Sequence, residues 1–312
     1  MSGVGTRGTG TAHRQRVAAY YDATQVLYST LWSGSAVHYG LWDHDTRGHR
    51  QAIRNLDRLV AAELALSPGS RVLDAGCGIG GTSCYLAERH GLEVVGITLS
   101  RVQARHAGRR AARGGAAIRP RVLIADYLRT GFADAVFDGV IAIESSCHAE
   151  RKPDFLAEAF RVLRAGGRLV VLDGFRARPT AESDRYRELL AGMALPDLAP
   201  AGEFARQARR AGFVLQHDLD LTPRILPSAH RIAKLSAIGV CVCRMLRLPR
   251  AWLAHGRAGL AQLPLFAEGF LVYRAFVATK PEAMPLPDRP IRTPRPGRPR
   301  DEPRAPDGDA SP

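Results

Sequence analysis

Glycines and one carboxylate gather in the segment VLDAGCGIGG, residues 72–81. An apolar strand that runs through such a loop into a helix brings backbone close to a ligand and offers the free N–H groups of the helix start. Dinucleotide-binding folds carry a similar loop, but there G-x-G-x-x-G leads to an acidic ribose binder about 20 residues on. Here Asp74 stands two residues before the first glycine, where it suits a cationic amino-acid group and would repel a pyrophosphate.

Hydroxyls and an amide end the next apolar run, at the place where a dinucleotide site would have its acid. The run reads GITLS over residues 96–100, and Gln103 follows one turn later. Taken alone, Ser100 is equally well explained as the N-cap of a helix. Joined to the glycine loop, Thr98 and Gln103 indicate the ribose end of a nucleoside site.

Two groups that can accept a proton follow the fourth apolar run: Glu144 at its end and His148 four residues later. Ligands of open α/β sheets bind at the carboxyl ends of the strands, which makes both side chains candidates for acid–base chemistry. A capping or exposed histidine explains His148 equally well. Cys147 is expected to be a small residue of a pocket wall rather than a nucleophile.

Aromatic residues crowd the stretch 20–42. Any one of them fits an ordinary amphipathic helix packed on a sheet, but together they favour an aromatic wall able to stabilise a cation. They are Tyr20, Tyr21, Tyr28, Trp32, Tyr39 and Trp42.

The hydrophobic pattern predicts a mainly parallel sheet, in which the carboxyl ends of the strands lie at one edge. Short β-rich runs alternate with helical patterns, which is typical of βαβ units, and 214–221 with 269–279 predict a closing antiparallel pair. The predicted fold class is α/β, a doubly wound, mainly parallel seven-stranded sheet with an aromatic N-terminal helical segment and a helical insertion before the last strand. The other strands are expected at 71–75, 93–98, 121–126, 137–143 and 168–172, and helices near 81–90, 100–112, 153–164 and 203–211.

The 312 residues divide into a Gly/Thr-rich stretch at 1–12, a domain at 13–280 and a Pro/Arg-rich tail at 281–312. Both ends are expected to be disordered. The domain has a core at 60–175 and a helical substrate lid at about 180–198 and 223–266.

Composition excludes several classes of protein. The net charge is +14, but the basic excess forms no single block, so a solvated arginine-rich surface explains it better than a polyanion partner. The five cysteines have neither zinc spacing nor a disulfide pattern, so no metal site is expected. The polar N-terminus lacks the apolar part of a signal peptide, and the apolar run around 238–243 is too short to span a bilayer. A soluble, cytoplasmic protein is expected.

The motifs stand in the order of a known family. VLDAGCGIGG, then GITLSRVQ, then a strand ending in Asp126 and Tyr127 resemble a class I S-adenosylmethionine-dependent methyltransferase over about 70–175. More narrowly, FDGVIAIESSCHAERKPDFLAEAFRVLRAGGRLVVLDG is similar to sterol C-24 methyltransferases and to their γ-tocopherol methyltransferase and cyclopropane-synthase relatives. YYDATQVLYSTLWSGSAVHYGLW resembles the aromatic segment that closes the methyl-donor pocket in that superfamily.

The resemblance implies S-adenosylmethionine as cofactor and assigns residues to it. Asp126 accepts a hydrogen bond from the adenine amine, and Tyr127 flanks the ring. Tyr39 is expected to reach the carboxylate or methyl end of the donor. The methionine part is held by Asp74, Gly76, Gly78 and Gly80, and the ribose by Thr98 and Gln103, with Leu99 and Ser100 between them.

The chemistry of the methyl group then separates the possible acceptors. A sulfonium methyl is already electrophilic, so the protein must align a nucleophile and exclude water. An oxygen or nitrogen acceptor needs at most a base, whereas an alkene carbon develops positive charge that aromatic faces and a buried carboxylate stabilise. The sequence favours C-methylation of a small apolar isoprenoid (a sterol, prenyl diphosphate or related alkene), with Glu144, His148 and Tyr39 as catalytic residues.

Other functions stay open. They are O- or N-methylation of a small secondary metabolite and a methyltransferase-like cyclase. Nucleic acid is not expected as a partner, because no Asn/Asp-Pro-Pro-aromatic motif follows the fourth strand. The insertion at 223–266 is expected to wall an apolar substrate tunnel, with core packing and a membrane-surface position as alternatives. Its Arg244, Arg247 and Arg250 would suit a diphosphate head group.

Overall fold

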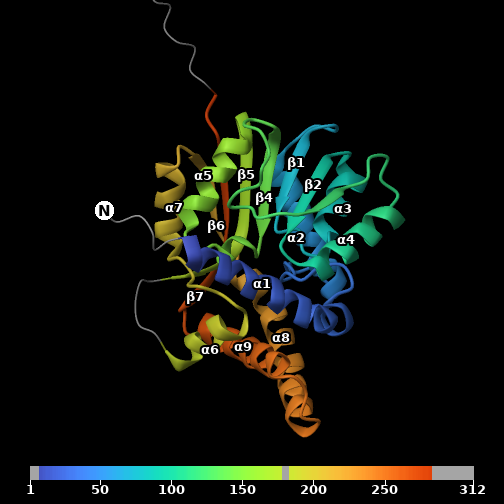
Figure 1. Ribbon diagram of the computed structural model, residues 1–312, viewed down its shortest axis with the longest axis vertical. Helices are drawn as coiled ribbons and strands as arrows, with labels where there is room; N and C mark the ends of the chain where they lie inside the picture. Colours follow the sequence, from blue (N-terminus) through green and yellow to red (C-terminus); the bar gives the residue numbers. More distant parts are fainter. Residues whose placement is uncertain (1–6, 178–182, 283–312) are drawn as a thin grey trace, which may run out of the picture. The chain divides into compact units, whose positions relative to one another are not determined.

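Seven strands form one sheet in the computed structural model, which describes residues 7–177 and 183–282 (Figure 1). The strand order is β3-β2-β1-β4-β5-β7-β6, and only β7 runs against its neighbours. The predicted fold class is therefore confirmed. The strands are β1 Arg71–Ala75, β2 Glu93–Thr98, β3 Arg121–Ile124, β4 Phe137–Ile143, β5 Leu163–Arg176, β6 Val214–Asp220 and β7 Leu271–Thr279.

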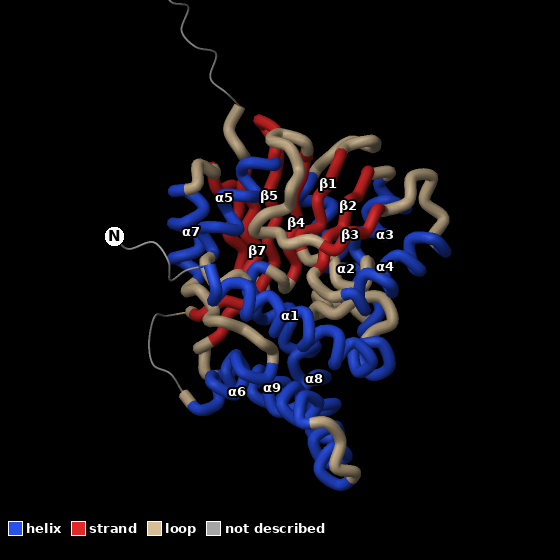
Figure 2. The backbone as a smooth tube through the Cα atoms, viewed as in Figure 1, coloured by secondary structure: helices blue, strands red, loops and turns tan. Residues whose placement is uncertain are grey.

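Helices cover both faces of the sheet (Figure 2). The strands at its centre read as continuous apolar runs because each face is buried in its own hydrophobic cluster. One cluster includes α2, α3, α8 and α9, and the other includes α5 and α7. The helices are α1 Arg7–Leu27, α2 His49–Leu64, α3 Gly81–His90, α4 Arg101–Arg113, α5 Lys152–Val162, α6 Asp184–Gly192, α7 Ala201–Arg210, α8 Thr222–Met245 and α9 Arg250–Ala267.

Disorder was predicted for both ends of the chain, and the structure describes part of the first end but little of the second. Helix α1 begins at Arg7, so residues 7–12 are helical rather than part of an unstructured leader. Its first turns are tied to the domain, since His13 contacts the carbonyl of His148 and Arg14 forms an ion pair with Asp126. Apart from 281 and 282, the tail lies outside the described residues, as do 1–6 and 178–182.

The insertion before the last strand is a pair of helices, α8 and α9, which we call the α8–α9 hairpin (residues 222–267). The apolar run around 238–243 is short, but α8 as a whole is long and apolar enough to cross a membrane by length and composition. Only 22% of its most apolar stretch is buried. A helix of a soluble core would be mostly buried, so this helix presents apolar surface.

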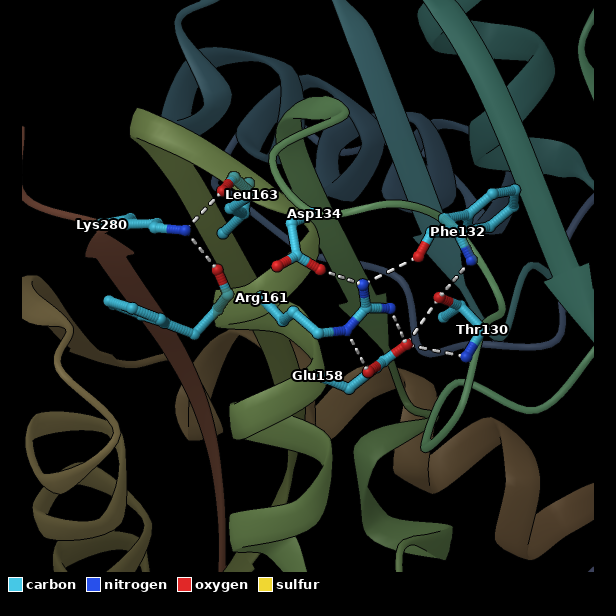
Figure 3. Close-up of polar contacts among 8 residues, drawn as sticks. Thr130, Phe132, Asp134, Glu158, Arg161, Leu163 and Lys280 are labelled. Carbon is cyan, nitrogen blue, oxygen red and sulfur yellow. Dashed lines mark hydrogen bonds and ion pairs between the residues drawn. The ribbon is translucent and has the colours of Figure 1, made fainter.

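An ion-pair network fixes the long connection between β3 and β4 (Figure 3). Arg161 of α5 donates to Glu158 (2.9 Å), to Asp134 (2.6 Å) and to the carbonyl of Phe132 (2.8 Å). Glu158 also accepts from the Thr130 hydroxyl (2.6 Å). Burial acts to raise the pKa of Glu158, but its bonds to Arg161 and Thr130 outweigh burial and lower the pKa to about 2. The network anchors the segment that follows Asp126 and Tyr127.

Candidate active site

Two cavities meet at the carboxyl ends of the central strands. The smaller, about 70 Å³, lies among α1 and the segments that follow β1, β2, β3 and β4. The larger, about 170 Å³, lies between α1, the end of β5, α6 and the α8–α9 hairpin. Four residues line both cavities: Tyr21, Val37, Glu144 and His148. A group bound in one cavity can therefore reach a group bound in the other across these four side chains.

The glycine loop forms part of the wall of the smaller cavity. Gly76 and Gly78 have φ values of +101° and +53°, a conformation that favours glycine. A Cβ on Gly78 would lie 3.3 Å from Cγ2 of Val37, which is a tight contact, and 3.9 Å from Nε2 of Gln103. A Cβ on Gly76 would lie only 2.4 Å from that of Ser145. Gly80 does not line the cavity but packs against Ala107, so its role is to let α3 and α4 approach.

The predicted ribose end carries an unsatisfied donor. Thr98, Leu99, Ser100 and Gln103 all line the smaller cavity. The Thr98 hydroxyl donates to Gln103 Oε1 at 3.0 Å, while Gln103 Nε2 is buried and has no partner among the described residues. A buried amide without a partner is costly, and a ligand hydroxyl would satisfy it. Ser100 is also the N-cap of α4, which confirms that explanation, while its place in a nucleoside site stays a prediction.

Asp126 and Tyr127 close the other end of the smaller cavity. One Asp126 oxygen accepts from the backbone N–H of Leu128 (2.8 Å), and the other pairs with Arg14 of α1 (3.1 Å). The Tyr127 hydroxyl donates to the carbonyl of Ser145 (2.8 Å), which fixes the ring beside the cavity. The positions expected to hold adenine therefore share one wall.

Asp74 lies behind the glycine loop and lines neither cavity. It is buried, and its carboxyl group accepts from the Ser83 hydroxyl at 2.5 Å. Burial raises the pKa of Asp74 to about 7, with the Ser83 bond acting in the opposite direction. Its expected contact with a cationic ligand group stays a prediction.

Glu144 occupies the junction of the two cavities in a left-handed backbone conformation, with φ +47°. Its Oε1 atom accepts from the backbone N–H of Tyr39 (2.7 Å) and from the Tyr273 hydroxyl (2.9 Å). Burial raises the pKa of Glu144 to about 8, and the nearby Asp173 acts in the same direction, whereas the two hydrogen bonds lower it. The side chain is therefore a carboxyl group that titrates near neutral pH.

His148 is neutral at the same junction because burial lowers its pKa to about 3. Its Nδ1 atom faces the carbonyl of Ala194 at 3.4 Å, which can only accept. The proton therefore lies on Nδ1, and Nε2 accepts from the Tyr21 hydroxyl at 2.8 Å. His148 can take part in proton transfer only through Tyr21 or after that bond opens.

Tyr39 lines the larger cavity, and its hydroxyl donates to Gln262 of α9 through a short hydrogen bond. The main chain of Tyr39 contacts Glu144, but its ring points toward Gln262 rather than the smaller cavity. The structure thus brings Glu144, His148 and Tyr39 together as predicted residues of one site. The cofactor part of the set is split, since Asp74 and Gly80 lie outside the cavity wall.

Sequence reasoning missed three polar residues. Tyr273 on β7 holds Glu144, Gln262 on α9 holds Tyr39, and His255 on α9 contacts the Tyr20 hydroxyl at 2.9 Å. Each lies on an element far along the chain from its partner, and no local motif marks it. Among residues 10–177 and 183–282, no three His, Cys, Asp or Glu side chains form a possible metal site. The five cysteines are free.

Comparison with known sequences gives one family match and several methyltransferases. The profile of the mycolic acid cyclopropane synthetase family matches residues 9–220. The chain is 35% identical over 217 residues to 24-methylenesterol C-methyltransferase 2 of Oryza sativa subsp. japonica (68% of this chain, 59% of that protein). It is 37% identical over 173 residues to the chloroplastic tocopherol O-methyltransferase of Arabidopsis thaliana (52% and 49%). The matches thus span about half to three fifths of these two relatives.

Solved structures with the same fold include proteins of different chemistry. The [4+2]-cyclase SpnF superposes with a TM-score of 0.74 at 27% identity, covering 86% of this chain and 97% of that one. The cyclopropane synthase MmaA2 from Mycobacterium tuberculosis gives 0.76 at 20% identity, covering 86% and 98%. A geranyl diphosphate methyltransferase in complex with GPP and sinefungin gives 0.70 at 23% identity, covering 86% and 99%.

Proposed function

The chain belongs to the mycolic acid cyclopropane synthetase family, and with it to the class I S-adenosylmethionine-dependent methyltransferases, and on this premise we propose that it methylates a carbon atom of a neutral, apolar isoprenoid-type alkene. The observation that carries the proposal is Glu144 at the junction of the two cavities. S-adenosylmethionine supplies the electrophilic methyl group when it is bound.

The smaller cavity fits this cofactor on features of the chain itself. Gln103 has a buried donor without a partner, which suits a ribose hydroxyl. Gly78 leaves open the space that a Cβ would take between Val37 and Gln103. Glu144 at the inner end offers a carboxyl group to a sulfonium cation. Thr98, Asp126 and Tyr127 complete the set that would hold the nucleoside.

The lining of the larger cavity supports an uncharged substrate. No lysine or arginine is among its described lining residues, which are mainly aliphatic and aromatic. Arg244, Arg247 and Arg250 are exposed at the turn of the α8–α9 hairpin and do not line the cavity. A diphosphate head group would therefore meet no lysine or arginine among the described residues that line this cavity. This favours a sterol or related alkene over a prenyl diphosphate.

Glu144 fits the role of a base after methyl transfer to an alkene. The transfer would form a carbon–carbon bond as the sulfur–methyl bond breaks, and it would leave positive charge on the other alkene carbon. Loss of a proton from a carbon next to that cation would restore an alkene. Both hydrogen bonds of Glu144 end on Oε1, and among the described residues none reaches Oε2. Oε2 can therefore accept the proton, while Tyr21 and Tyr28 present aromatic surface that stabilises the cation.

A second candidate is O-methylation, favoured by the neutral His148 that lines both cavities. A substrate hydroxyl in the place of the Tyr21 hydroxyl could pass its proton to Nε2. The relative named tocopherol O-methyltransferase supports this class, and the similarity to SpnF supports a cyclase.

One assay separates the three candidates. The chain is incubated with S-adenosylmethionine carrying a labelled methyl group and a panel of sterols, prenyl diphosphates and phenols, and the products are identified by mass spectrometry. We expect label on a carbon of a neutral alkene. Label on oxygen alone would favour the second candidate. Cofactor binding with no transfer, but with conversion of a polyene to its isomer, would favour a cyclase.

A further inference from the structure

The α8–α9 hairpin carries charge of only one sign. Residues 222–267 contain no Asp or Glu, and their seven basic residues are half of the chain's net charge of +14. Among the described residues, no carboxylate forms an ion pair with Arg244, Arg247 or Arg250, all of which are exposed. The seven are Arg224, Arg231, Lys234, Arg244, Arg247, Arg250 and Arg257.

The tip of the hairpin is also apolar. Ile238, Met245 and Leu246 are 64%, 72% and 62% exposed, the largest exposed fractions among the exposed large hydrophobic residues. Figure 1 shows this turn, in orange, at the end of the domain away from the sheet. Apolar side chains interleaved with exposed arginines on a helix are typical of surfaces that bind the interface of a bilayer.

The inner side of the same hairpin is the wall of the larger cavity. Ile232, Leu235, Cys243 and Trp252 all line it. One layer of helix therefore separates the exposed apolar surface from the place where an apolar substrate would bind.

We propose that the tip of the α8–α9 hairpin docks on the surface of an anionic lipid bilayer. Met245 and Leu246 enter the acyl-chain region, while Arg244, Arg247 and Arg250 reach the lipid phosphates with their charged ends. The proposal rests on the proposed function in one respect, that the bilayer delivers the apolar substrate to the larger cavity. It takes up the membrane-surface position that the sequence left as an alternative for this insertion.

Two other occupants fit the surface less well. A second copy of the chain, docked tip to tip, would bring Arg244, Arg247 and Arg250 against the same three arginines, and the hairpin has no carboxylate to pair with them. An acidic protein would pair with the arginines but would not need the adjacent exposed apolar residues. The helix lies on the bilayer rather than crossing it, because Cys243 and Leu235 on α8 face the cavity inside the domain.

Vesicle flotation tests the proposal with the full chain, in the absence of cofactor and substrate. Vesicles contain phosphatidylcholine alone or mixed with phosphatidylglycerol. We expect binding to the anionic vesicles, weakened by salt. The variant Arg244→Gln/Arg247→Gln/Arg250→Gln should bind the anionic vesicles about a hundredfold more weakly, because each of the three lost cations contributes a factor of about five. The matched control, Arg206→Gln/Arg209→Gln/Arg210→Gln on α7, removes equal charge from another surface and should change binding much less.

A second variant tests the apolar part of the surface. Met245→Asp/Leu246→Asp should lower vesicle binding at least tenfold, while Ile118→Asp, an exposed apolar position remote from the hairpin in sequence, should not. Circular dichroism and calorimetric binding of S-adenosylmethionine verify that each variant is folded. Since vesicle binding is measured without methyl transfer, it can succeed or fail independently of the proposed function.

Three outcomes would overturn the proposal. The first is no binding of the wild-type chain to anionic vesicles, and the second is equal weakening by the α7 control. The third is a dimer in analytical ultracentrifugation that Met245→Asp/Leu246→Asp dissociates, which would assign the surface to a second copy.

Discussion

Glu144→Gln removes the ionisable group at the junction of the two cavities and keeps the shape of the side chain. The Tyr39 N–H and the Tyr273 hydroxyl both donate to Oε1, and the glutamine carbonyl oxygen can accept both bonds. The fold should therefore be retained, and so should the affinity for S-adenosylmethionine at pH 7, where most of the Glu144 side chains are protonated. If Glu144 is the base, turnover should fall by about 10²–10⁴, the usual contribution of a positioned base.

The pH profile gives a sharper test than the rate at one pH. Burial raises the pKa of Glu144 to about 8, so roughly a tenth of the free protein carries the carboxylate at pH 7. Wild-type kcat/KM should rise about tenfold between pH 7 and pH 9, and the Glu144→Gln variant should lack this limb. Tyr273→Phe removes a hydrogen bond that lowers this pKa, so it should move the limb to higher pH.

The measurement is single-turnover transfer of a labelled methyl group, with cofactor affinity determined separately by calorimetry. Tyr273→Phe is the matched control because it perturbs the same carboxyl group without removing it. The reasoning would be refuted if Glu144→Gln lost cofactor binding while bound cofactor still reacted at the normal rate. Glu144 would then be a ligand of the cofactor, and an oxygen or nitrogen acceptor would become the better explanation.

Four further predictions concern the cofactor side of the site. Affinity for S-adenosylmethionine should rise between pH 6 and pH 8.5 as Glu144 ionises at the inner end of the smaller cavity and Asp74 ionises behind the glycine loop. Calorimetry should show a weaker trend for S-adenosylhomocysteine, which lacks the sulfonium charge. Without cofactor, thermal unfolding should show that stability falls as pH rises from about 4.5 to about 8, because the carboxyl groups of Asp74 and Glu144 both have raised pKa values in the folded state. The ionisation of Glu144 should lower the free energy of unfolding by at most about 5 kcal/mol. Gln103→Ala should weaken cofactor binding about five- to tenfold, because Nε2 is the donor left for a ligand, and calorimetry would expose any other result. The melting temperature should fall slightly, because the Thr98 hydroxyl loses its bond to Gln103 Oε1. Asp74→Ala should abolish measurable cofactor binding, and wild-type affinity in that variant would remove Asp74 from the site.

The family, the sheet and the cofactor could be predicted because their signals are local in the sequence. An apolar run, a glycine loop and a helix start lie within residues 72–90, and each element needs only its own neighbours to form. The end of β4 is equally local, which is why Glu144 was found. The direction of the Asp74 side chain could not be predicted in this way, because a residue at the end of a strand can point toward the ligand or toward the next helix. In the structure Asp74 contacts Ser83 of α3.

The partners of the catalytic candidates could not be predicted in the same way. Tyr273 lies 129 residues from Glu144 and stands in a regular alternating strand, so only the pairing of β7 with β5 brings it to the site. His255 and Tyr20 are 235 residues apart. The apolar run at 238–243 is evident in the sequence, but its hydrophobic pattern does not show which side of α8 the rest of the fold covers.

The left-handed backbone at Glu144 has a consequence for protein engineering. A non-glycine residue at φ +47° is strained by about 1–2 kcal/mol relative to glycine, and this residue also holds a buried carboxyl group. Glu144→Gly would relieve both costs but would leave the Tyr39 N–H and the Tyr273 hydroxyl without their acceptor. A library selected for heat resistance alone should therefore enrich that change only above about pH 8, where the buried carboxyl group is charged. The enriched variants would be more stable and inactive, since stability and activity place opposite demands on this position. Directed evolution of this chain therefore needs a selection that couples survival to methyl transfer.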